Sequence, residues 1–160
     1  MKKTFIATGI LVGLLLLIFS ALFVSEKENR IAPLSSDPDS EYVYTTSTVQ
    51  IAGKTIQVDL AQTPAELSRG LSGRRSLAEG TGMLFIFENP DTYGFWMKDM
   101  LFPIDIIWID EGKIIHIEKN ISPDTYPEIF TPNSPAKYVL EVPAGFSDKN
   151  GLKIGGMIIF

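Results

Sequence analysis

The chain begins with one long apolar run, after which apolar residues occur in short segments separated by polar turns. No residue from Thr4 to Val24 is charged, and about 20 apolar residues suffice for a helix to cross the hydrocarbon core of a bilayer. The run therefore predicts a transmembrane helix that anchors the protein.

Two alternatives to an anchor remain open for this run. A cleaved secretory signal usually has an apolar region of about 7 to 15 residues that ends at small residues. Here Phe19-Ser20-Ala21 places Phe where a small residue is expected. A buried helix of a soluble protein is the least favoured alternative, because the run is long and unbroken.

The residues that flank the run predict the location of the rest of the chain. Lys2 and Lys3 precede the run, and positive flanks stay on the cytoplasmic side. We therefore expect residues 1–24 to be a membrane anchor or signal peptide. Residues 25–41 are rich in Ser, Pro, Asp and Glu and predict a disordered tether. Residues 42–160 are expected to form an exported domain, held at the cell membrane by one span and outside the cytoplasm.

The exported domain shows the pattern of short strands. In TSTVQIAGKTIQVDLA, alternating apolar residues indicate two strands joined at Ala52-Gly53-Lys54. Asp110-Glu111-Gly112 joins two more strands in the same way. GMLFIFE, FWMK, IDIIWID, KIIHIEK and KYVLEVP are rich in β-branched and aromatic residues, and residues 157–160 predict a closing strand. The expected fold class is mainly β, a small antiparallel sheet that is closed or sandwich-like.

Two short helices complete this expectation. Thr63 is a suitable N-cap, followed by Pro64 at the first helical position and Glu66 at the third, and this helix is expected to end at Gly70. A second short helix is expected within residues 146–150.

Composition and charge restrict the classes of partner. The formal net charge of the 160 residues is −5, and the exported part, without Lys2 and Lys3, carries about −7. This acidity argues against nucleic acid and anionic lipid as electrostatic partners. The absence of cysteine excludes disulfides, thiol catalysis and cysteine-ligated zinc. With His116 as the only histidine, we expect no metal site and no cofactor.

The stretch from Gly94 to Asp110 carries charges through an apolar segment. Strand alternation places Trp96 and Lys98 on one face of a first strand, and Asp105 faces a side of the next strand shared with isoleucines. An unpaired charge is costly there, so Lys98 and Asp105 are expected to pair with each other or with Arg69. One interpretation is a structural ion pair or a lysine whose stem covers the aromatics. The other is a pocket in which Lys98 or Arg69 receives an anionic or polar ligand stacked on Trp96.

Carboxylate pairs are the basis of an enzymatic alternative. Glu88, Asp91, Asp99 and Asp105 are the candidates for acid and base chemistry. The distance between two carboxyl groups decides which mechanism they support, and the sequence does not give that distance.

Four motifs occur in a familiar order: TPAELSRGLSGRRSL, GMLFIF, FWMKDMLFPIDIIWID and AKYVLEVPAG. Over residues 49–159 the chain resembles the domain of unknown function 192 family, an uncharacterised group of bacterial and archaeal proteins that often carry an N-terminal export or anchor segment. The resemblance implies no established reaction. It departs at Asp99-Met100, where many relatives have Asn-Thr, and between Asn120 and Pro135, where some have cysteines.

The family pattern makes a shared polar cluster more plausible, although a shared structural core gives the same pattern. It falls on the following residues: Arg69, Gly70, Leu71, Gly82, Met83, Leu84, Phe85, Phe95, Trp96, Met97, Lys98, Pro103, Asp105, Ala136, Tyr138, Leu140, Glu141 and Gly145.

Together, these observations predict a membrane-tethered, non-enzymatic binding or envelope-interaction module. Its candidate ligand-binding residues are Arg69, Trp96, Lys98 and Asp105. The expected partners are the lipid bilayer, through the N-terminal helix, and a small polar or anionic ligand or an envelope protein. The alternative is a hydrolase acting on envelope carbohydrate or peptide with a carboxylate pair such as Asp99 and Asp105. A purely structural domain without a cleft is the third possibility.

Overall fold

The computed structural model describes residues 43–160. The expected anchor (residues 1–24) and tether (residues 25–41) lie outside the described residues. Within residues 43–160, no helix has the length and apolar character needed to cross a membrane.

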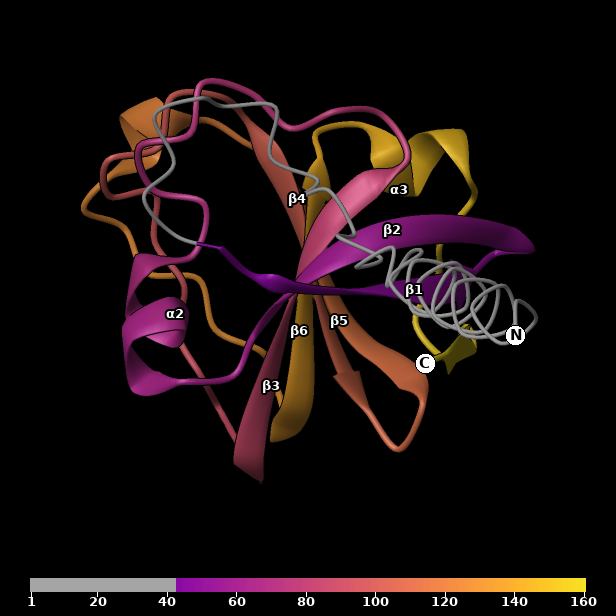
Figure 1. Cartoon of the computed structure of the whole chain (residues 1–160). Coiled ribbons are helices and arrows are strands. Elements are labelled where there is room, and N and C mark those ends of the chain that lie inside the picture. Colours follow the sequence, from indigo (N-terminus) through magenta and orange to yellow (C-terminus); the bar gives the residue numbers. More distant parts are fainter. Residues whose placement is uncertain (1–42) are drawn as a thin grey trace, which may run out of the picture. The chain divides into compact units, whose positions relative to one another are not determined.

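In this part of the chain, seven strands form one sheet in the order β5-β4-β6-β3-β2-β1-β7 (Figure 1). The strands are β1 (Thr45–Ile51), β2 (Lys54–Ala61), β3 (Thr81–Asp91), β4 (Ile104–Asp110), β5 (Lys113–Ile121), β6 (Ala136–Pro143) and β7 (Ile158–Ile159). All neighbouring strands are antiparallel except β2 and β3, which are parallel. A bridge between Lys113 and Met157 connects the two edges, so the sheet curls on itself. The mainly β prediction is confirmed.

The predicted turns and helices are present. Ala52 and Gly53, and Glu111 and Gly112, all have positive φ angles, as hairpin turns of two residues require. The helix α2 (Pro64–Arg69) has a capping box, since Thr63 and Glu66 bond each other's backbone. The helix α3 (Phe146–Lys149) lies on the other side of the sheet from α2 (Figure 1). A 3-10 turn, η1 (Pro123–Thr125), was not predicted.

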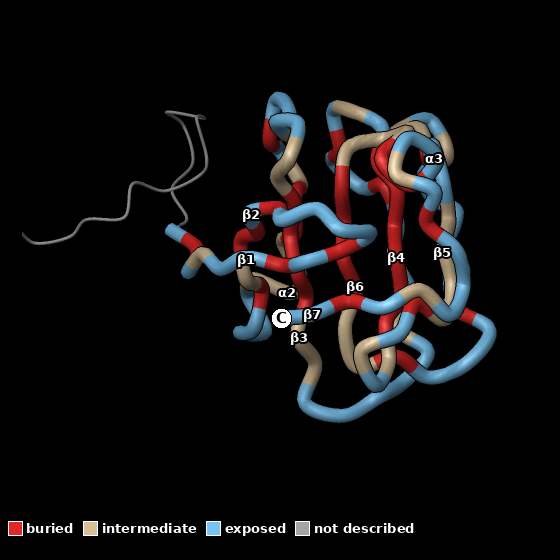
Figure 2. Tube along the Cα trace, turned by 90° about the vertical axis from the view of Figure 1, so that its right-hand side faces the viewer, coloured by how far each residue is buried: buried red, intermediate tan, exposed pale blue. Residues whose placement is uncertain are grey.

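The two faces of the curled sheet carry two separate apolar cores. All seven strands contribute to the interior core, together with Phe146 of α3 and Leu152 after it. The outer core covers the other face of β2, β3, β6, β4 and β5, and its remaining members include Leu71, Met97 and Met100 from loops. The strand β4 lies between the two cores and is buried along almost its whole length, whereas buried and exposed positions alternate at the end of β1 (Figure 2). The outer core therefore depends on loops, and these loops build the site described below.

The FWMK segment is not a strand, and this expectation was wrong. Phe95 makes a single bridge with Phe130, and a turn follows at Lys98 and Asp99, where Asp99 has a φ of 57°. Phe95, Met97 and Met100 face the outer core, whereas Trp96 and Lys98 are exposed. These three apolar residues are not evenly spaced, so a loop and not a strand packs all of them on the sheet. Their packing thus overrides the strand propensity of the segment.

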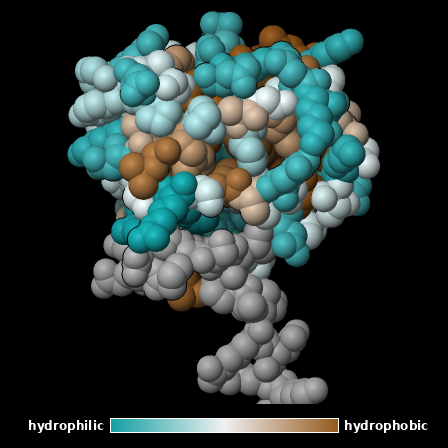
Figure 3. Space-filling view, turned by 90° about the horizontal axis from the view of Figure 1, so that it is seen from above, coloured by the Kyte–Doolittle hydropathy of each residue, from teal (hydrophilic) through white to brown (hydrophobic). Residues whose placement is uncertain are grey.

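Apart from Val43, at the start of the described residues, large apolar side chains are exposed in two places. One set lies on the loops that cover the outer core, and the other lies near the C-terminus. The first set is Trp96, Leu101, Tyr126 and Ile129, and the second is Ile154, Met157, Ile159 and Phe160. Seen from above the view of Figure 1, apolar residues reach the surface within a surround of hydrophilic ones (Figure 3).

Candidate binding cleft

Two adjoining cavities lie between the C-terminal end of α2, the loop that follows it, and the loop 92–103. The inner compartment has a cavity volume of about 140 Å³ and is lined by residues of α2, β3 and β6 and of both loops. The outer compartment has a cavity volume of about 370 Å³. Both compartments share four wall residues, Ser68, Arg69, Ser72 and Trp96. We therefore treat them as one cleft.

Hydrogen bonds between the two loops hold the walls of the cleft together. The Ser72 hydroxyl donates to the Lys98 carbonyl at 2.9 Å, and the Gly73 N–H donates to the Asp99 carbonyl at 2.8 Å. Gly70 has a positive φ, and a Cβ there would lie 3.1 Å from the Phe85 ring. Glycine at this position lets the chain leave α2 close against the outer core.

The outer compartment combines cationic side chains with an aromatic face. Lys98 and Arg69 both line it, beside Trp96. The Lys98 ammonium lies 5.9 Å from the centre of the Trp96 ring, and the indole is half exposed and meets Tyr126 edge to face. An anionic group next to a flat ring would find a charge and a stacking surface here.

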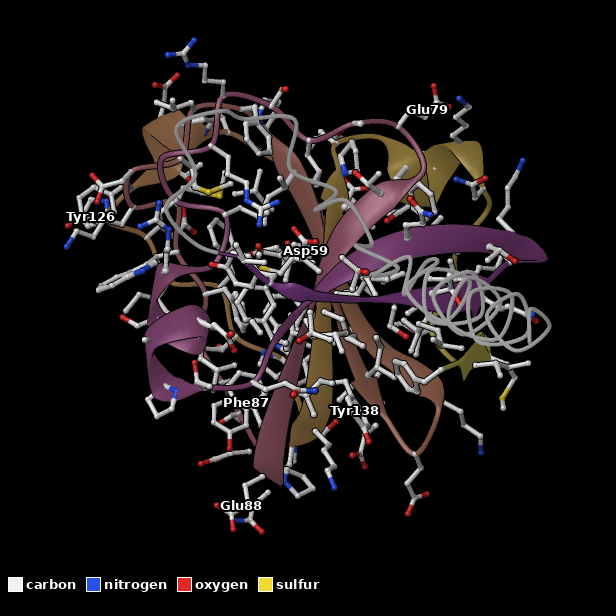
Figure 4. All side chains as sticks on the ribbon, in the orientation of Figure 1. Asp59, Glu79, Phe87, Glu88, Tyr126 and Tyr138 are labelled. Atoms are coloured by element: carbon white, nitrogen blue, oxygen red, sulfur yellow. The ribbon has the colours of Figure 1, made fainter. Side chains whose placement is uncertain are left out.

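Five of the residues that line the inner compartment are aromatic. Phe85 meets Phe95 edge to face with ring centres 4.9 Å apart, and Phe87 stacks on Tyr93 at 3.6 Å. All four rings line the compartment, as does Trp96. Phe87 lies on the side of the molecule where α2 is located (Figure 4). The compartment thus presents ring faces and edges to a ligand.

One buried carboxyl group lines this aromatic compartment. Glu141 of β6 is 5% exposed, and its Oε2 atom has no hydrogen-bond partner among residues 43–160. Burial raises the pKa of Glu141 to about 8, although the nearby Arg74 guanidinium acts in the opposite direction. The raised pKa favours the protonated form of Glu141 at neutral pH, in which the carboxyl group is a hydrogen-bond donor.

An ion pair lies in the same cross-strand row as Glu141. Asp59 of β2 faces Met83 of β3, which in turn faces Glu141. The Arg74 Nη2 atom lies 2.7 Å from the Asp59 carboxylate, and the guanidinium also covers the Tyr44 ring at 5.1 Å. Figure 4 shows Asp59 at the middle of the sheet. Arg74 Nη2 lacks a well-directed hydrogen bond, so the contact is mainly electrostatic.

Replacing Arg74 by Met is expected to lower the free energy of unfolding by about 3 kcal/mol, because it leaves the Asp59 carboxylate buried without a counter-ion. Urea unfolding measures this loss. Arg75→Met, at an exposed neighbour, is the matched control and should cost less than about 1 kcal/mol. Adding Asp59→Leu to Arg74→Met should recover part of the loss. An Arg74→Met protein as stable as the wild type would contradict this role for the ion pair.

The structure brings together three of the four residues that the sequence singled out. Arg69, Trp96 and Lys98 line the outer compartment, and Asp105 does not. Asp105 is fully buried, and its carboxylate accepts hydrogen bonds from the backbone N–H groups of Asn120, Gly145 and Ser147. Within residues 43–160, Lys98 and Asp105 form no salt bridge, so the expected pairing is absent. Asp105 is thus a structural residue that fixes the chain around the start of α3.

Asp99 and Asp105 do not share a cleft. Asp105 lies on the face of β4 that also carries Ile107 and Ile109 of the interior core. Asp99 belongs to a loop that covers the opposite face and lines the outer compartment. The structure therefore gives no geometric basis for this carboxylate pair.

Sequence reasoning did not single out Glu141, Arg74 or Asp59 as site residues. For Glu141 a signal existed, because this acidic residue stands between Leu140 and Val142 in a strand with apolar residues on both faces. Asp59 and Arg74 gave no comparable signal, since their pairing joins β2 to a loop 15 residues later.

The sequence model of DUF192, described as "Uncharacterized ACR", matches residues 47–160. The chain belongs to the DUF192 family. No curated protein matches the sequence.

Two solved structures are similar to this DUF192 domain. One, from Sinorhizobium meliloti 1021, is provisionally described as a transcription regulator. It is 32% identical, with a TM-score of 0.70, and the match covers 74% of this chain and 96% of that chain. The other, from Novosphingobium aromaticivorans DSM 12444, is described as a protein of unknown function. It is 28% identical, with a TM-score of 0.72, and the match covers 82% of this chain and 94% of that chain.

Proposed function

We propose that this DUF192 domain is a binding module for a small organic anion, which it holds in the cleft between α2 and the loop 92–103. The observation that carries the proposal is the convergence of Lys98, Arg69 and Trp96 on one cavity that continues into an aromatic compartment. The cationic side chains attract the anionic group, and the aromatic rings bury the rest of the ligand.

We further propose that the module acts outside the cytoplasm, tethered to the cell membrane. The uncharged run from Thr4 to Val24 and the preceding lysines support this location. The tether of residues 25–41 would let the cleft reach soluble ligands or an envelope protein at some distance from the bilayer.

The Sinorhizobium protein is described as a transcription regulator, but we do not propose that role for this chain. Residues 43–160 of this chain contain ten Lys and Arg and fourteen Asp and Glu, a net charge of −4. Proteins that bind nucleic acid usually carry a basic surface, because neutralising phosphates supplies most of the affinity. The acidic balance favours a small-molecule ligand.

A comparison of benzoate with benzamide tests the anion site, because the two probes share a ring and differ in charge. We expect benzoate to bind about fivefold tighter than benzamide at pH 7, the gain from one partly exposed charge contact. Lys98→Ala should reduce this preference, because Arg69 alone remains, and should not change stability by more than about 0.5 kcal/mol, because Lys98 is exposed. Isothermal titration calorimetry and urea unfolding measure the two quantities.

Lys153→Ala is the matched control for charge, since Lys153 is exposed and does not line the cleft. Trp96→Ala should weaken both probes, because it removes the stacking surface shared by the two compartments. Equal binding of benzoate and benzamide, or equal effects of Lys98→Ala and Lys153→Ala, would refute the anion site.

A further inference from the structure

The inner compartment has the size and lining of a site for a single ring. Its volume of about 140 Å³ is close to that of an engineered apolar cavity of about 150 Å³ that binds benzene in another protein. Phe85, Phe87, Tyr93 and Phe95 line the walls. Such walls favour an aromatic ring through stacked and edge-to-face contacts.

Besides the polar wall residues Ser68, Arg69 and Ser72, one buried carboxyl group sets this compartment apart from an apolar cavity. Oε2 of Glu141 is buried, lacks a hydrogen-bond partner among residues 43–160, and belongs to a residue that lines the compartment. A buried polar atom without a partner costs free energy, and a ligand atom of the complementary kind removes that cost.

The charges around Glu141 decide which kind of ligand atom fits. Arg74, from the loop after α2, is the charge that acts on Glu141, and it pairs with Asp59 of β2, which lies in the same cross-strand row with Met83 in between. Arg69 and Tyr93 share the compartment wall, and Tyr44 packs on Arg74. Two arginines make the surroundings unfavourable for a ligand cation. A carboxyl group that remains protonated there acts as a hydrogen-bond donor, because burial raises its pKa.

We infer that the ligand is a compact heteroaromatic or oxo-substituted aromatic acid, whose ring occupies the inner compartment with a hydrogen-bond acceptor on the edge that faces Glu141. The acid group of the same ligand lies toward Lys98 in the outer compartment. This inference rests on the proposed function and names its ligand class. Glu141 thereby determines specificity, as the residue that separates rings with an acceptor from rings without one.

Isonicotinate and benzoate form a matched pair of probes for the full-length chain, because a ring nitrogen replaces one C–H opposite the carboxylate. At pH 7, isonicotinate should bind the wild type about tenfold tighter than benzoate, the gain from one buried hydrogen bond. At pH 9.5 this preference should disappear, because ionised Glu141 no longer donates. Calorimetric titrations at both pH values measure the ratio.

Two variants assign the effect to Glu141. Glu141→Gln should keep the preference at both pH values, because its amide donates a hydrogen bond regardless of pH. Glu141→Leu should show no preference at either pH. If a variant fails to fold, the wild-type titrations at the two pH values still decide the question, with urea unfolding at pH 9.5 as the control that the wild type is folded there.

The outcomes separate this inference from the proposed function. Equal binding of isonicotinate and benzoate by the wild type, or a preference that persists at pH 9.5, would overturn the inference and leave the anion site intact. If neither acid binds the wild type, the proposed function and the inference both fail.

Discussion

Asp105→Ala is expected to lower the free energy of unfolding by about 5 kcal/mol. The substitution removes a fully buried carboxylate that accepts hydrogen bonds from the backbone N–H groups of Asn120, Gly145 and Ser147, with N···O distances of 2.8 to 3.1 Å. Hydrogen bonds to charged groups contribute about 1.5–3 kcal/mol each, and buried donors left without partners add to the cost. Urea unfolding at pH 7 measures the loss.

Two further variants separate this role from a general effect of charge. Asp105→Asn should cost about 2–3 kcal/mol, because its amide nitrogen would face a backbone donor. Asp148→Ala removes an exposed carboxylate from its surface pair with Lys119 and should cost about 0.5 kcal/mol. If Asp105→Ala lost no more than Asp148→Ala, Asp105 would not be the structural residue described here.

The second large effect concerns the pH dependence of stability. Burial raises the pKa of Glu141 from 4.5 to about 8, so the folded state holds this proton more tightly than the unfolded state. Its contribution is fully present below pH 4.5, decreases as the pH rises, and is lost once the pH passes about 8. The loss amounts to about 5 kcal/mol at about 1.36 kcal/mol per pH unit.

Glu141→Gln isolates this contribution, because the amide does not titrate in this range. The free energy of unfolding of the variant minus that of the wild type should rise by about 5 kcal/mol between pH 4.5 and pH 9. Other titrating groups cancel in the difference. Among them is Glu66, whose pKa is lowered by backbone N–H groups of Thr63 and Gln62. A difference that stays constant across this range would show that Glu141 is not buried in its protonated form.

Local patterns predicted most of the fold. The hairpin turns and both helices depend on residues within a few positions of one another, such as Thr63 and Glu66 of the capping box. The parallel contact between β2 and β3 was not predicted, because it depends on α2 and a loop that reverse the chain between them. The strand predicted for FWMK is absent, because a loop without strand periodicity buries Met97 and Met100 and packs the partly buried Phe95 on the outer core.

The candidate site was predicted only in part for a similar reason. Arg69, Trp96 and Lys98 attracted attention as charged and aromatic residues in family motifs, and the structure places them on one cavity. Asp105 shared those sequence properties but lies on the opposite face of β4, where backbone N–H groups surround it. Sequence reveals that a charge lies in an apolar segment, whereas the partner of that charge depends on which distant segments meet it.

The central claim is that a small organic anion binds beside Trp96, and the two tryptophans of the domain offer a direct test. Trp96 is half exposed in the cleft, whereas Trp108 is fully buried and donates its indole N–H to the Tyr93 carbonyl. In ¹H–¹⁵N spectra each indole gives a separate signal, which a Trp96→Phe variant assigns. On titration with benzoate, we expect the Trp96 signal to shift and saturate while the Trp108 signal moves much less, and Lys98→Ala should weaken the saturation. A Trp96 signal that does not move at saturating benzoate would contradict the claim.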